Sequence, residues 1–303
     1  MSVLVTGGAG FIGTALARRL TQLDIDVVLL DLPGRFKAFH RAVWECLELD
    51  VSNWDQLKVL SDRKFTTVFH LAAQTSSHVS QLKPELDVDT NVKGVLNVLN
   101  LCRRASVEKI VFTSSVAVYG SREGKISETD PLLPVANYGC TKVAGEAFIR
   151  CYGQYGIKHT IFRLFNVYGP GQDYENLMQG MLSIYMAQAI TNGVIRMTGS
   201  MERYRDFVYI DDVVDALLMA MSGLHSLVLN VGTGNATRVQ ELVEVIGKLE
   251  GRDIFVENIG SHEGDIFGSV ADISSIKEQG WSPSWDIGEG IVRMYADARE
   301  ALR

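Results

Sequence analysis

The sequence predicts an α/β protein: a Rossmann-type doubly wound parallel sheet with a smaller, interleaved C-terminal substrate-binding lobe. Three observations indicate this fold class. The first half alternates short apolar runs with helical patterns, which is typical of βαβ units. A glycine-rich turn follows the first apolar run. From about Gly169 the regularity is lost, and loops and shorter elements take over.

The expected strands are nearly continuous in hydrophobic residues, the pattern of strands that helices cover on both faces. They are Val3–Thr6, Val27–Asp31, Cys46–Leu49, Thr67–Leu71, Ile110–Ser114 and Thr160–Leu164. Helical patterns lie at Ile12–Leu23, Asp87–Arg104, Ala136–Tyr155, Gln179–Thr191 and Val239–Leu249. Thr237 and Gln240 have the spacing of a capping box before the last of these helices.

The chain of 303 residues suits one large α/β domain with a smaller lobe. Residues 1–168 are expected to form the nucleotide-binding domain, which also receives segments near 206–231, and 169–303 to form most of the lobe. No internal repeat or flexible linker interrupts the sequence. The two parts should therefore be interleaved rather than strung on a tether.

Composition limits the function classes. A net charge of −7 argues against nucleic acid as a partner, since nucleic-acid binding favours a basic surface. The four cysteines have no CxxC spacing, so we expect thiols in a reducing compartment and no metal site. No apolar run reaches the roughly 18 residues that span a bilayer, and the N-terminus lacks a signal peptide's pattern. A cytoplasmic protein without membrane contact is predicted.

The glycine-rich turn predicts a nucleotide-binding site. Gly7, Gly10 and Gly13 lie between a strand that ends at Thr6 and a helix that begins near Phe11. Glycine is needed where such a turn is tight and where backbone approaches a pyrophosphate. The N–H groups at the start of the helix then face the phosphates.

The acid that the turn requires is Asp31, 18 residues after Gly13 at the end of the second strand. Its carboxylate can accept hydrogen bonds from ribose hydroxyls and would repel a 2′-phosphate, so NAD is favoured over NADP. Arg35 and Lys37 leave NADP open, because a nearby basic group could compensate.

Ser115, Tyr138 and Lys142 form the candidate catalytic set. Ser115 follows a buried strand, and Tyr138 and Lys142 lie one turn apart on the next helix. A lysine ammonium beside a phenol is expected to lower the phenol's pKa from about 10. Tyr138 could then take a proton from a sugar hydroxyl while Ser115 holds the same oxygen. This pattern indicates hydride chemistry on an alcohol or ketone.

These motifs together resemble the extended short-chain dehydrogenase/reductase family, in its NAD-dependent nucleotide-sugar epimerase/dehydratase branch. The resemblance covers nearly the whole chain and includes the opening VTGGAGFIG, the run His70–Gln74, Asn91, the run Arg163–Gly171 and the run Arg205–Val213. It implies a cofactor set of Gly7, Gly10, Phe11, Ile12, Gly13, Asp31, Asp50, Val51, Leu71, Ala72, Ala73, Thr113, Tyr138 and Lys142. His70 is expected to be structural, and Asn91 is left open between a structural and a cofactor role.

The same resemblance implies the reaction. Family members that eliminate water carry an Asp-Glu pair just before the positions of Val118 and Tyr119, whereas this chain has Val116 and Ala117. Apolar side chains cannot transfer protons, so dehydration is disfavoured. What remains is reversible oxidation, most simply at C4 of a hexose. Re-reduction on the opposite face would make the protein a UDP-glucose 4-epimerase-like isomerase with UDP-hexose as the default substrate.

The substrate set that the resemblance implies is Ser115, Asn166, Asn176, Leu177, Arg205 and His262. Arg205 should offer its planar fork to a phosphate. His262 stands where the family has an arginine, and the stretch Gly199–Tyr204 is also unusual. Because both departures lie on the substrate side, the nucleobase and the sugar of the substrate stay undetermined.

Two other functions stay open. One is a one-way NAD(P)-dependent dehydrogenase or ketoreductase, and the other is a non-catalytic NAD-binding regulator, which would be expected to lose part of the catalytic set. The resemblance also implies a homodimer through helices near Asp87–Arg104 and Ala136–Tyr155.

Overall fold

The computed structural model describes residues 2–178, 180–260 and 267–303, and these divide into two interleaved units. The first unit holds Met1–Val118, Ala136–Arg163 and Val214–Leu229, and the second holds Tyr119–Val135, Leu164–Val213 and Asn230–Arg303. Tyr119–Val135 thus groups with the second unit, although it lies inside the predicted domain 1–168. The division at residue 168 stays a prediction.

A seven-stranded sheet carries the first unit, in the order β12-β7-β5-β4-β1-β2-β3. Its strands are β1 (Ser2–Thr6), β2 (Asp26–Asp31), β3 (Glu45–Glu48), β4 (Thr67–His70), β5 (Lys109–Ser115), β7 (Lys158–Leu164) and β12 (Leu227–Val231). The pairs from β3 to β5 are all parallel. This confirms the predicted fold class, and each of the six predicted strands differs from the observed one by at most two residues at either end.

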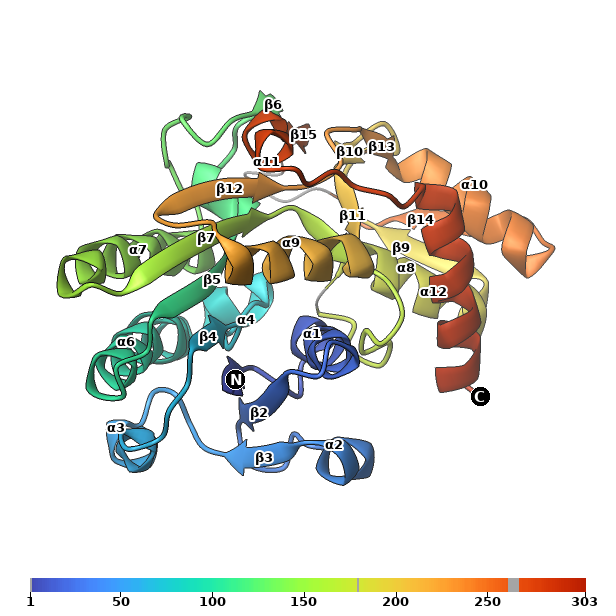
Figure 1. The fold of residues 1–303 in the computed structure, drawn as a ribbon. Coiled ribbons are helices and arrows are strands. Elements are labelled where there is room, and N and C mark those ends of the chain that lie inside the picture. The colour runs from blue at the N-terminus through green and yellow to red at the C-terminus, as the bar shows by residue number, and fades with distance from the viewer. Residues whose placement is uncertain (1, 179, 261–266) are drawn as a thin grey trace. The chain divides into compact units, whose positions relative to one another are not determined.

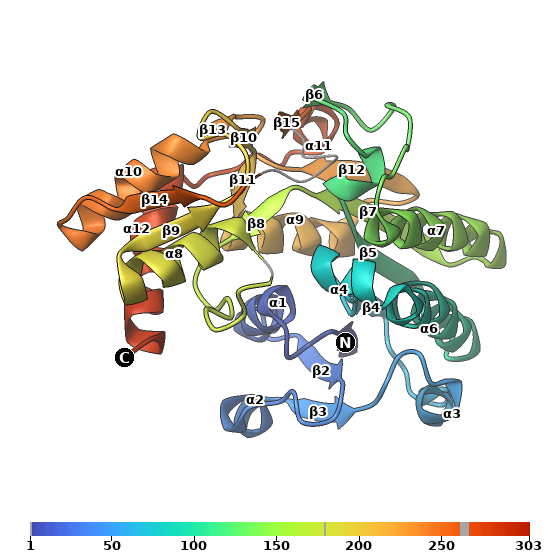
Figure 2. The same ribbon diagram turned by 180° about the vertical axis from the view of Figure 1, so that it is seen from behind.

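Helices cover both faces of this sheet (Figures 1 and 2). α1 (Phe11–Gln22) and α9 (Ile210–Ser222) lie on one face, and α3 (Trp54–Leu57), α6 (Gly94–Arg104) and α7 (Asn137–Tyr152) lie on the other. Shorter elements complete the unit: α2 (Ala38–Val43), η1 (Lys58–Leu60), α4 (Ser77–Leu82), α5 (Pro84–Asp87), η3 (Val116–Tyr119) and η4 (Gly153–Tyr155). Burial on both faces explains the continuous apolar runs, since Val3, Leu4 and Val5 are all fully buried.

The register places the strand ends at one edge. Thr6 of β1 pairs with His70 of β4, and His70 pairs with Phe112 of β5. Parallel strands end at the same edge, so the segments that follow β1, β4 and β5 are neighbours. Open α/β sheets bind their ligands at this carboxyl edge.

The described residues of the second unit form three small sheets. They are β13-β10-β15-β6, β11-β8 and β14-β9. Their strands are β6 (Gly124–Ile126), β8 (Asn166–Tyr168), β9 (Val194–Met197), β10 (Tyr204–Arg205), β11 (Phe207–Tyr209), β13 (Thr237–Arg238), β14 (Phe255–Asn258) and β15 (Gly268–Ala271). Its helices are α8 (Met181–Asn192), α10 (Val239–Glu250), α11 (Ser274–Glu278) and α12 (Ile287–Ala301), and α8, α10 and α12 pack on one another (Figure 1).

Two predicted helix features are corrected. The helix expected at Asp87–Arg104 contains a π-helical segment, η2 (Val88–Lys93), between α5 and α6. The expected capping box at Thr237 is also wrong, because Thr237 belongs to β13. Arg238 is the N-cap of α10, and Glu241 accepts a hydrogen bond from its N–H at 3.2 Å.

In the described part of the chain, we find no helix with both the length and the apolar character needed to cross a bilayer.

Candidate functional site

The glycine turn between β1 and α1 leaves no room for side chains. Gly7 has φ +71°, and a Cβ on it would lie 2.7 Å from the backbone nitrogen of Ala72. A Cβ on Gly13 would lie 2.2 Å from the carbonyl oxygen of Gly7. Gly10 is the N-cap of α1, so the first N–H groups of that helix, from Phe11 onward, have no partner within the helix. The turn therefore fits a bound pyrophosphate.

Asp31 braces this turn from the end of β2. One carboxylate oxygen accepts from the N–H of Ala9 at 3.0 Å, and the other accepts from the N–H of Leu32 at 2.8 Å. A carboxylate has about four acceptor positions, so two remain for ribose hydroxyls. The structure thus agrees with a carboxylate that favours NAD.

The other predicted cofactor residues follow β3 and β4. Asp50 accepts from the N–H of Ser52 at 2.8 Å, and the Val51 carbonyl accepts from the side chain of Asn97 at 2.9 Å. The segment Leu71–Ala73 lies against the glycine turn, since Leu71 N–H donates to the carbonyl of Thr6 at 3.1 Å. Thr113 is buried in β5.

His70 and Asn91 both make contacts inside the protein. The His70 Nδ1 atom lies 2.7 Å from the hydroxyl of Thr6, and the residue is 1% exposed. Asn91 accepts from the N–H of Gln74 at 2.8 Å and donates to its carbonyl at 2.9 Å. These contacts give both residues structural roles: Thr6 joins His70 to β1, and Asn91 fixes the loop after β4.

Ser115, Tyr138 and Lys142 come together in the first unit. Ser115 ends β5, and its hydroxyl lies close enough to the phenol of Tyr138, in the first turn of α7, to lower the pKa of that phenol. Lys142 is 3% exposed, and its ammonium donates to the carbonyl of Thr113 at 2.8 Å. The same nitrogen lies 5.8 Å from the centre of the Tyr138 ring. A phenol and a hydroxyl can thus share one substrate oxygen beside a buried cation.

Lys142 was predicted to lower the pKa of Tyr138. For the protein without bound cofactor this prediction is wrong. Burial raises the pKa of Tyr138 to about 12, and the Ser115 hydroxyl opposes that rise only in part. Burial also lowers the pKa of Lys142 to about 8, against the opposing charges of Glu146 and Asp87. Desolvation thus outweighs the pairwise attraction on which the prediction was based.

Apart from Ser115, the predicted substrate residues of the described chain lie in the second unit. Asn166, in β8, donates from its side chain to the carbonyl of Asp206 at 3.0 Å. The side chain of Asn176 accepts from the N–H of Met178 at 3.1 Å, and Leu177 is 51% exposed. Arg205 is half-buried and donates to the carbonyl of Tyr204 at 2.8 Å. His262 lies outside the described residues.

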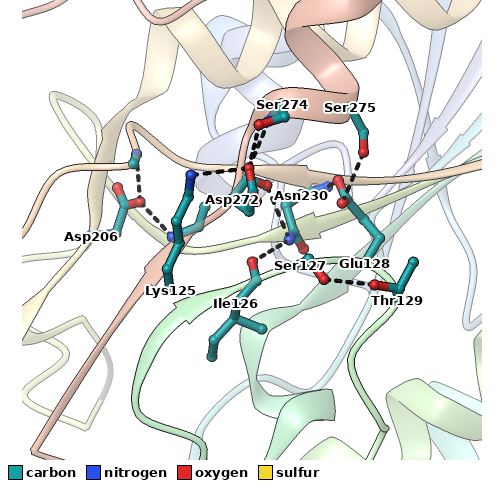
Figure 3. Close-up of polar contacts among 12 residues, drawn as sticks. Lys125, Ile126, Ser127, Glu128, Thr129, Asp206, Asn230, Asp272, Ser274 and Ser275 are labelled. Atoms are coloured by element: carbon teal, nitrogen blue, oxygen red, sulfur yellow. Dashed lines mark hydrogen bonds and ion pairs between the residues drawn. The ribbon is translucent and has the colours of Figure 1, made fainter.

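Asp206 braces the backbone next to Arg205. It is fully buried and accepts from the N–H and hydroxyl of Thr233 and from the N–H groups of Gly234 and Ala271, at 2.7 to 3.0 Å. Figure 3 shows it beside a second polar cluster around Asn230, whose side chain donates to the carbonyl of Ile126 at 2.9 Å. Asp206 thus fixes the backbone that directly follows Arg205.

Sequence reasoning missed three residues of this region. Gly8 is as tightly packed as its neighbours, because a Cβ on it would lie 2.8 Å from the Cβ of Leu29. Asp206 was read only as part of a motif. Glu146 was not singled out, although it is fully buried on α7 one turn after Lys142. The available signal was an acid at the same four-residue spacing after Tyr138 and Lys142.

The chain is similar to known enzymes over almost its full length. A Methanocaldococcus jannaschii protein provisionally named UDP-glucose 4-epimerase is 36% identical, with 96% of each chain covered. A UDP-glucose 4-epimerase from Mycolicibacterium smegmatis is 34% identical, with 97% of each covered. A dTDP-4-dehydro-6-deoxyglucose reductase from Escherichia coli is 30% identical, with 98% of this chain and 97% of the other covered.

The chain is also similar to solved structures over almost its full length. UDP-glucose 4-epimerase from Thermotoga maritima, with UDP-glucose, matches with TM-score 0.93 and 31% identity over all of both chains. The enzyme of that name from Thermus thermophilus, in complex with NAD, gives 0.92 and 32% over 99% of this chain and all of the other. UDP-glucuronic acid 4-epimerase from Bacillus cereus, with its substrate and NAD, gives 0.90 and 26% over 99% of this chain and all of the other.

Residues 3–232 match the NAD dependent epimerase/dehydratase family. The match and these relatives confirm the predicted NAD cofactor and the predicted short-chain dehydrogenase/reductase type of enzyme. The chain therefore belongs to the NAD-dependent epimerase/dehydratase family, in its nucleotide-sugar epimerase branch.

Proposed function

We propose that the protein is a UDP-hexose 4-epimerase, which oxidises C4 of the sugar transiently and reduces it again on the opposite face. The observation that carries the proposal is that the Ser115 hydroxyl and the Tyr138 phenol lie together beside the buried Lys142, whose ammonium donates to the carbonyl of Thr113 at 2.8 Å. A hydroxyl and a phenol that meet at one point suit a single alcohol oxygen. These two groups can serve both the oxidation and the re-reduction of the carbon that bears this oxygen.

The glycine turn and Asp31 would hold NAD, which would supply a hydride acceptor and donor for C4. Tyr138 takes the hydroxyl proton on oxidation and gives it back on reduction. The high pKa of the phenol, about 12, keeps Tyr138 protonated in the protein alone. The positive charge of a bound nicotinamide would favour the phenolate. Ser115 fixes the oxygen, and Lys142 supplies a cation that water does not screen.

The segment after Ser115 lacks the acid and the base that elimination of water from the sugar would need. Val116 and Ala117 begin η3 directly after the catalytic serine, and both are partly exposed. Removing a hydroxyl from the neighbouring carbon needs an additional acid and base. Neither apolar side chain can serve, which leaves chemistry at one carbon.

The UDP part of the proposal rests on the second unit and on the relatives. Asn166, Asn176 and Leu177 are proposed to contact the nucleotide-diphosphate sugar, with Arg205 binding the diphosphate. A protein with net charge −7 needs a local cation for such an anion. Relatives named for UDP-glucose support UDP, whereas the B. cereus enzyme acts on a UDP sugar with a C6 carboxylate. The proposal takes the neutral hexose as the default.

The test is proton NMR of the purified protein with catalytic NAD and, in turn, UDP-glucose, UDP-glucuronic acid, UDP-N-acetylglucosamine and dTDP and GDP sugars. A new anomeric signal at unchanged mass, absent with Tyr138→Phe, is the expected result for UDP-glucose. If another sugar alone reacts, the UDP-hexose assignment is wrong. If none reacts, epimerisation is wrong.

A one-way reductase is the second candidate, and the similarity to the E. coli reductase favours it. Such an enzyme would consume one nicotinamide per sugar, whereas an epimerase regenerates its cofactor in each cycle. Absorbance at 340 nm with the same sugars separates the two. The presence of Ser115, Tyr138 and Lys142 speaks against a non-catalytic regulator.

We also propose a homodimer formed through η2–α6 and α7. Leu86 and Val88, at the start of this helical stretch, are 42% and 52% exposed. Apolar side chains in such positions are often covered by a partner. Sedimentation equilibrium should give a mass of about 67 kDa, twice the chain mass of 33.5 kDa, and a mass of one chain would exclude the dimer. The cytoplasmic location stays a prediction.

A further inference from the structure

Three consecutive residues of β5 are tied to three successive turns of α7. The Ser115 hydroxyl lies beside the Tyr138 phenol and lowers its pKa, and the Thr113 carbonyl accepts from Lys142 at 2.8 Å. The Ser114 hydroxyl donates to a carboxylate oxygen of Glu146 at 2.6 Å. Tyr138, Lys142 and Glu146 are four residues apart and therefore share one face of the helix. The first two contacts involve the proposed catalytic set, and the third does not.

Glu146 is held by a complete set of donors. Arg163, on β7, donates to both carboxylate oxygens, at 2.9 Å from Nε and 2.7 Å from Nη2. Arg150 donates to one of them at 3.2 Å. With Ser114 these are four hydrogen bonds, as many as a carboxylate commonly accepts. Glu146 is fully buried, so this geometry is fixed.

We propose that Glu146 is a positioning residue for the Ser115–Tyr138–Lys142 set, because it locks the end of β5 to α7 and its carboxylate supplies the counter-charge of Lys142. The inference rests on the proposed function of those three residues. It adds a fourth side chain that touches neither substrate nor cofactor. Its action runs through Ser114 to Ser115 and along the helix to Lys142.

Stability alone does not explain a buried ion pair here. Replacing such a pair by apolar residues of similar volume is often neutral or stabilising. Glu146 and Arg163 join a helix to a strand that packed apolar side chains could also join. A charge that must be present one turn from a buried lysine explains why a carboxylate is used.

Electrostatics agrees with the geometry. Burial lowers the pKa of Lys142, and the negative charges of Glu146 and Asp87 oppose that effect. Arg163, Ser114 and Arg150 outweigh burial and lower the pKa of Glu146, so it is ionised at neutral pH. The other ionisable groups facing Lys142 are His70, which is uncharged at neutral pH, and Tyr138. Asp89 and Lys93, on the neighbouring η2, form an exposed pair of their own.

The test follows the protonation of Lys142 directly, without substrate. The protein is labelled with ¹³Cε-lysine, and the Lys142 resonance is assigned by its loss in Lys142→Met. The parent should titrate near pH 8, where the Lys142 pKa lies. Glu146→Gln keeps the size of the side chain and loses its charge, so the midpoint should fall by about one pH unit. Glu146→Asp keeps the charge, so its midpoint should stay near that of the parent.

An unchanged midpoint in Glu146→Gln would overturn the counter-charge role. If that variant fails to fold because Arg163 is left unpaired, the double change Glu146→Gln with Arg163→Met removes both charges. Arg163 is not among the groups that shift the pKa of Lys142, so the double variant should titrate as low as the single one.

Ser114→Ala tests the positioning half separately. It removes one hydrogen bond and leaves the carboxylate charged, so the Lys142 midpoint should not move. kcat should fall about tenfold with KM unchanged, because Ser115 loses its alignment. A parental kcat would overturn the positioning role. If the proposed function itself is wrong, no variant shows turnover, whereas the lysine titrations still decide the counter-charge role.

Discussion

The two units hold their candidate residues in different ways. In the first unit, Ser115, Tyr138 and Lys142 contact one another or the backbone of β5, and Lys142 is buried. In the second unit, Leu177 and Arg205 keep exposed surface and lie in a loop and on a two-residue strand. Residues that carry out the reaction can thus be fixed at the edge of a sheet. Residues that select the substrate can lie on loops and short strands, where substitutions are tolerated.

The largest effect should come from the phenol. Tyr138→Phe removes the group that moves the proton, so kcat should fall by about 10³-fold while the fold is kept. Steady-state kinetics on the substrate identified by NMR measures this. The matched control is Tyr119→Phe, which removes a buried hydroxyl that donates to Asn230 at 2.7 Å in the second unit. It should cost about 1 kcal/mol of stability and leave kcat within a few-fold. Equal kinetic losses in both variants would count against Tyr138.

The next effect should come from the glycine turn. Gly13→Ala places a Cβ 2.2 Å from the carbonyl of Gly7, so the turn must open. The dissociation constant for NAD, measured by calorimetry, should rise about 100-fold, or roughly 2.7 kcal/mol. Gly223→Ala is the control, since this glycine, like Gly13, has no positive φ, but nothing lies within 4 Å of the new Cβ. Parental NAD affinity in Gly13→Ala would show that the turn does not hold the cofactor.

A smaller effect is expected in the second unit. Arg205→Lys keeps the charge and loses the planar fork, so KM for the nucleotide sugar should rise about tenfold with kcat nearly unchanged. Arg196→Lys is the control, because Arg196 is exposed and paired with Glu257 at 2.8 Å. If KM is parental in Arg205→Lys, another group binds the diphosphate.

The smallest effect concerns stability against pH. Burial lowers the pKa of His70 from 6.5 to about 3. Between these values the unfolded chain binds a proton that the folded protein does not, so stability falls as the pH falls. The loss should be about 1.4 kcal/mol per pH unit from this residue. His70→Asn should flatten the curve of unfolding free energy between pH 6 and about 4, whereas His78→Asn, at an exposed histidine, should not. If the unfolding free energy of His70→Asn depends on pH as steeply as that of the parent, the loss of stability does not come from His70.

Local patterns made the first unit predictable. Strand ends, the glycine turn and the Tyr138–Lys142 spacing are each encoded within a few residues, and the structure places them within one or two positions. The capping box failed for the opposite reason. Thr237 pairs with Arg205 in an antiparallel ladder, so Arg238 and not Thr237 is the N-cap, and no local pattern contains that contact.

The parts that were missed depend on long-range contacts. Ser114, Glu146 and Arg163 are separated by 32 and 17 positions, and only the folded sheet brings them together. The pKa of Tyr138 was expected in the wrong direction because a sequence shows its neighbours and not its burial. Asp206 shows the same limit, since its donors at Thr233 and Ala271 come from late segments.

The most direct test of the central claim follows the hydrogen on C4. UDP-glucose carrying deuterium at C4 is incubated in ordinary water with the protein and catalytic NAD, and the product is examined by NMR and mass spectrometry. Transient oxidation with return of the same hydrogen predicts UDP-galactose that keeps deuterium at C4. Loss of the label to water, or accumulation of reduced cofactor in step with substrate, would contradict the account.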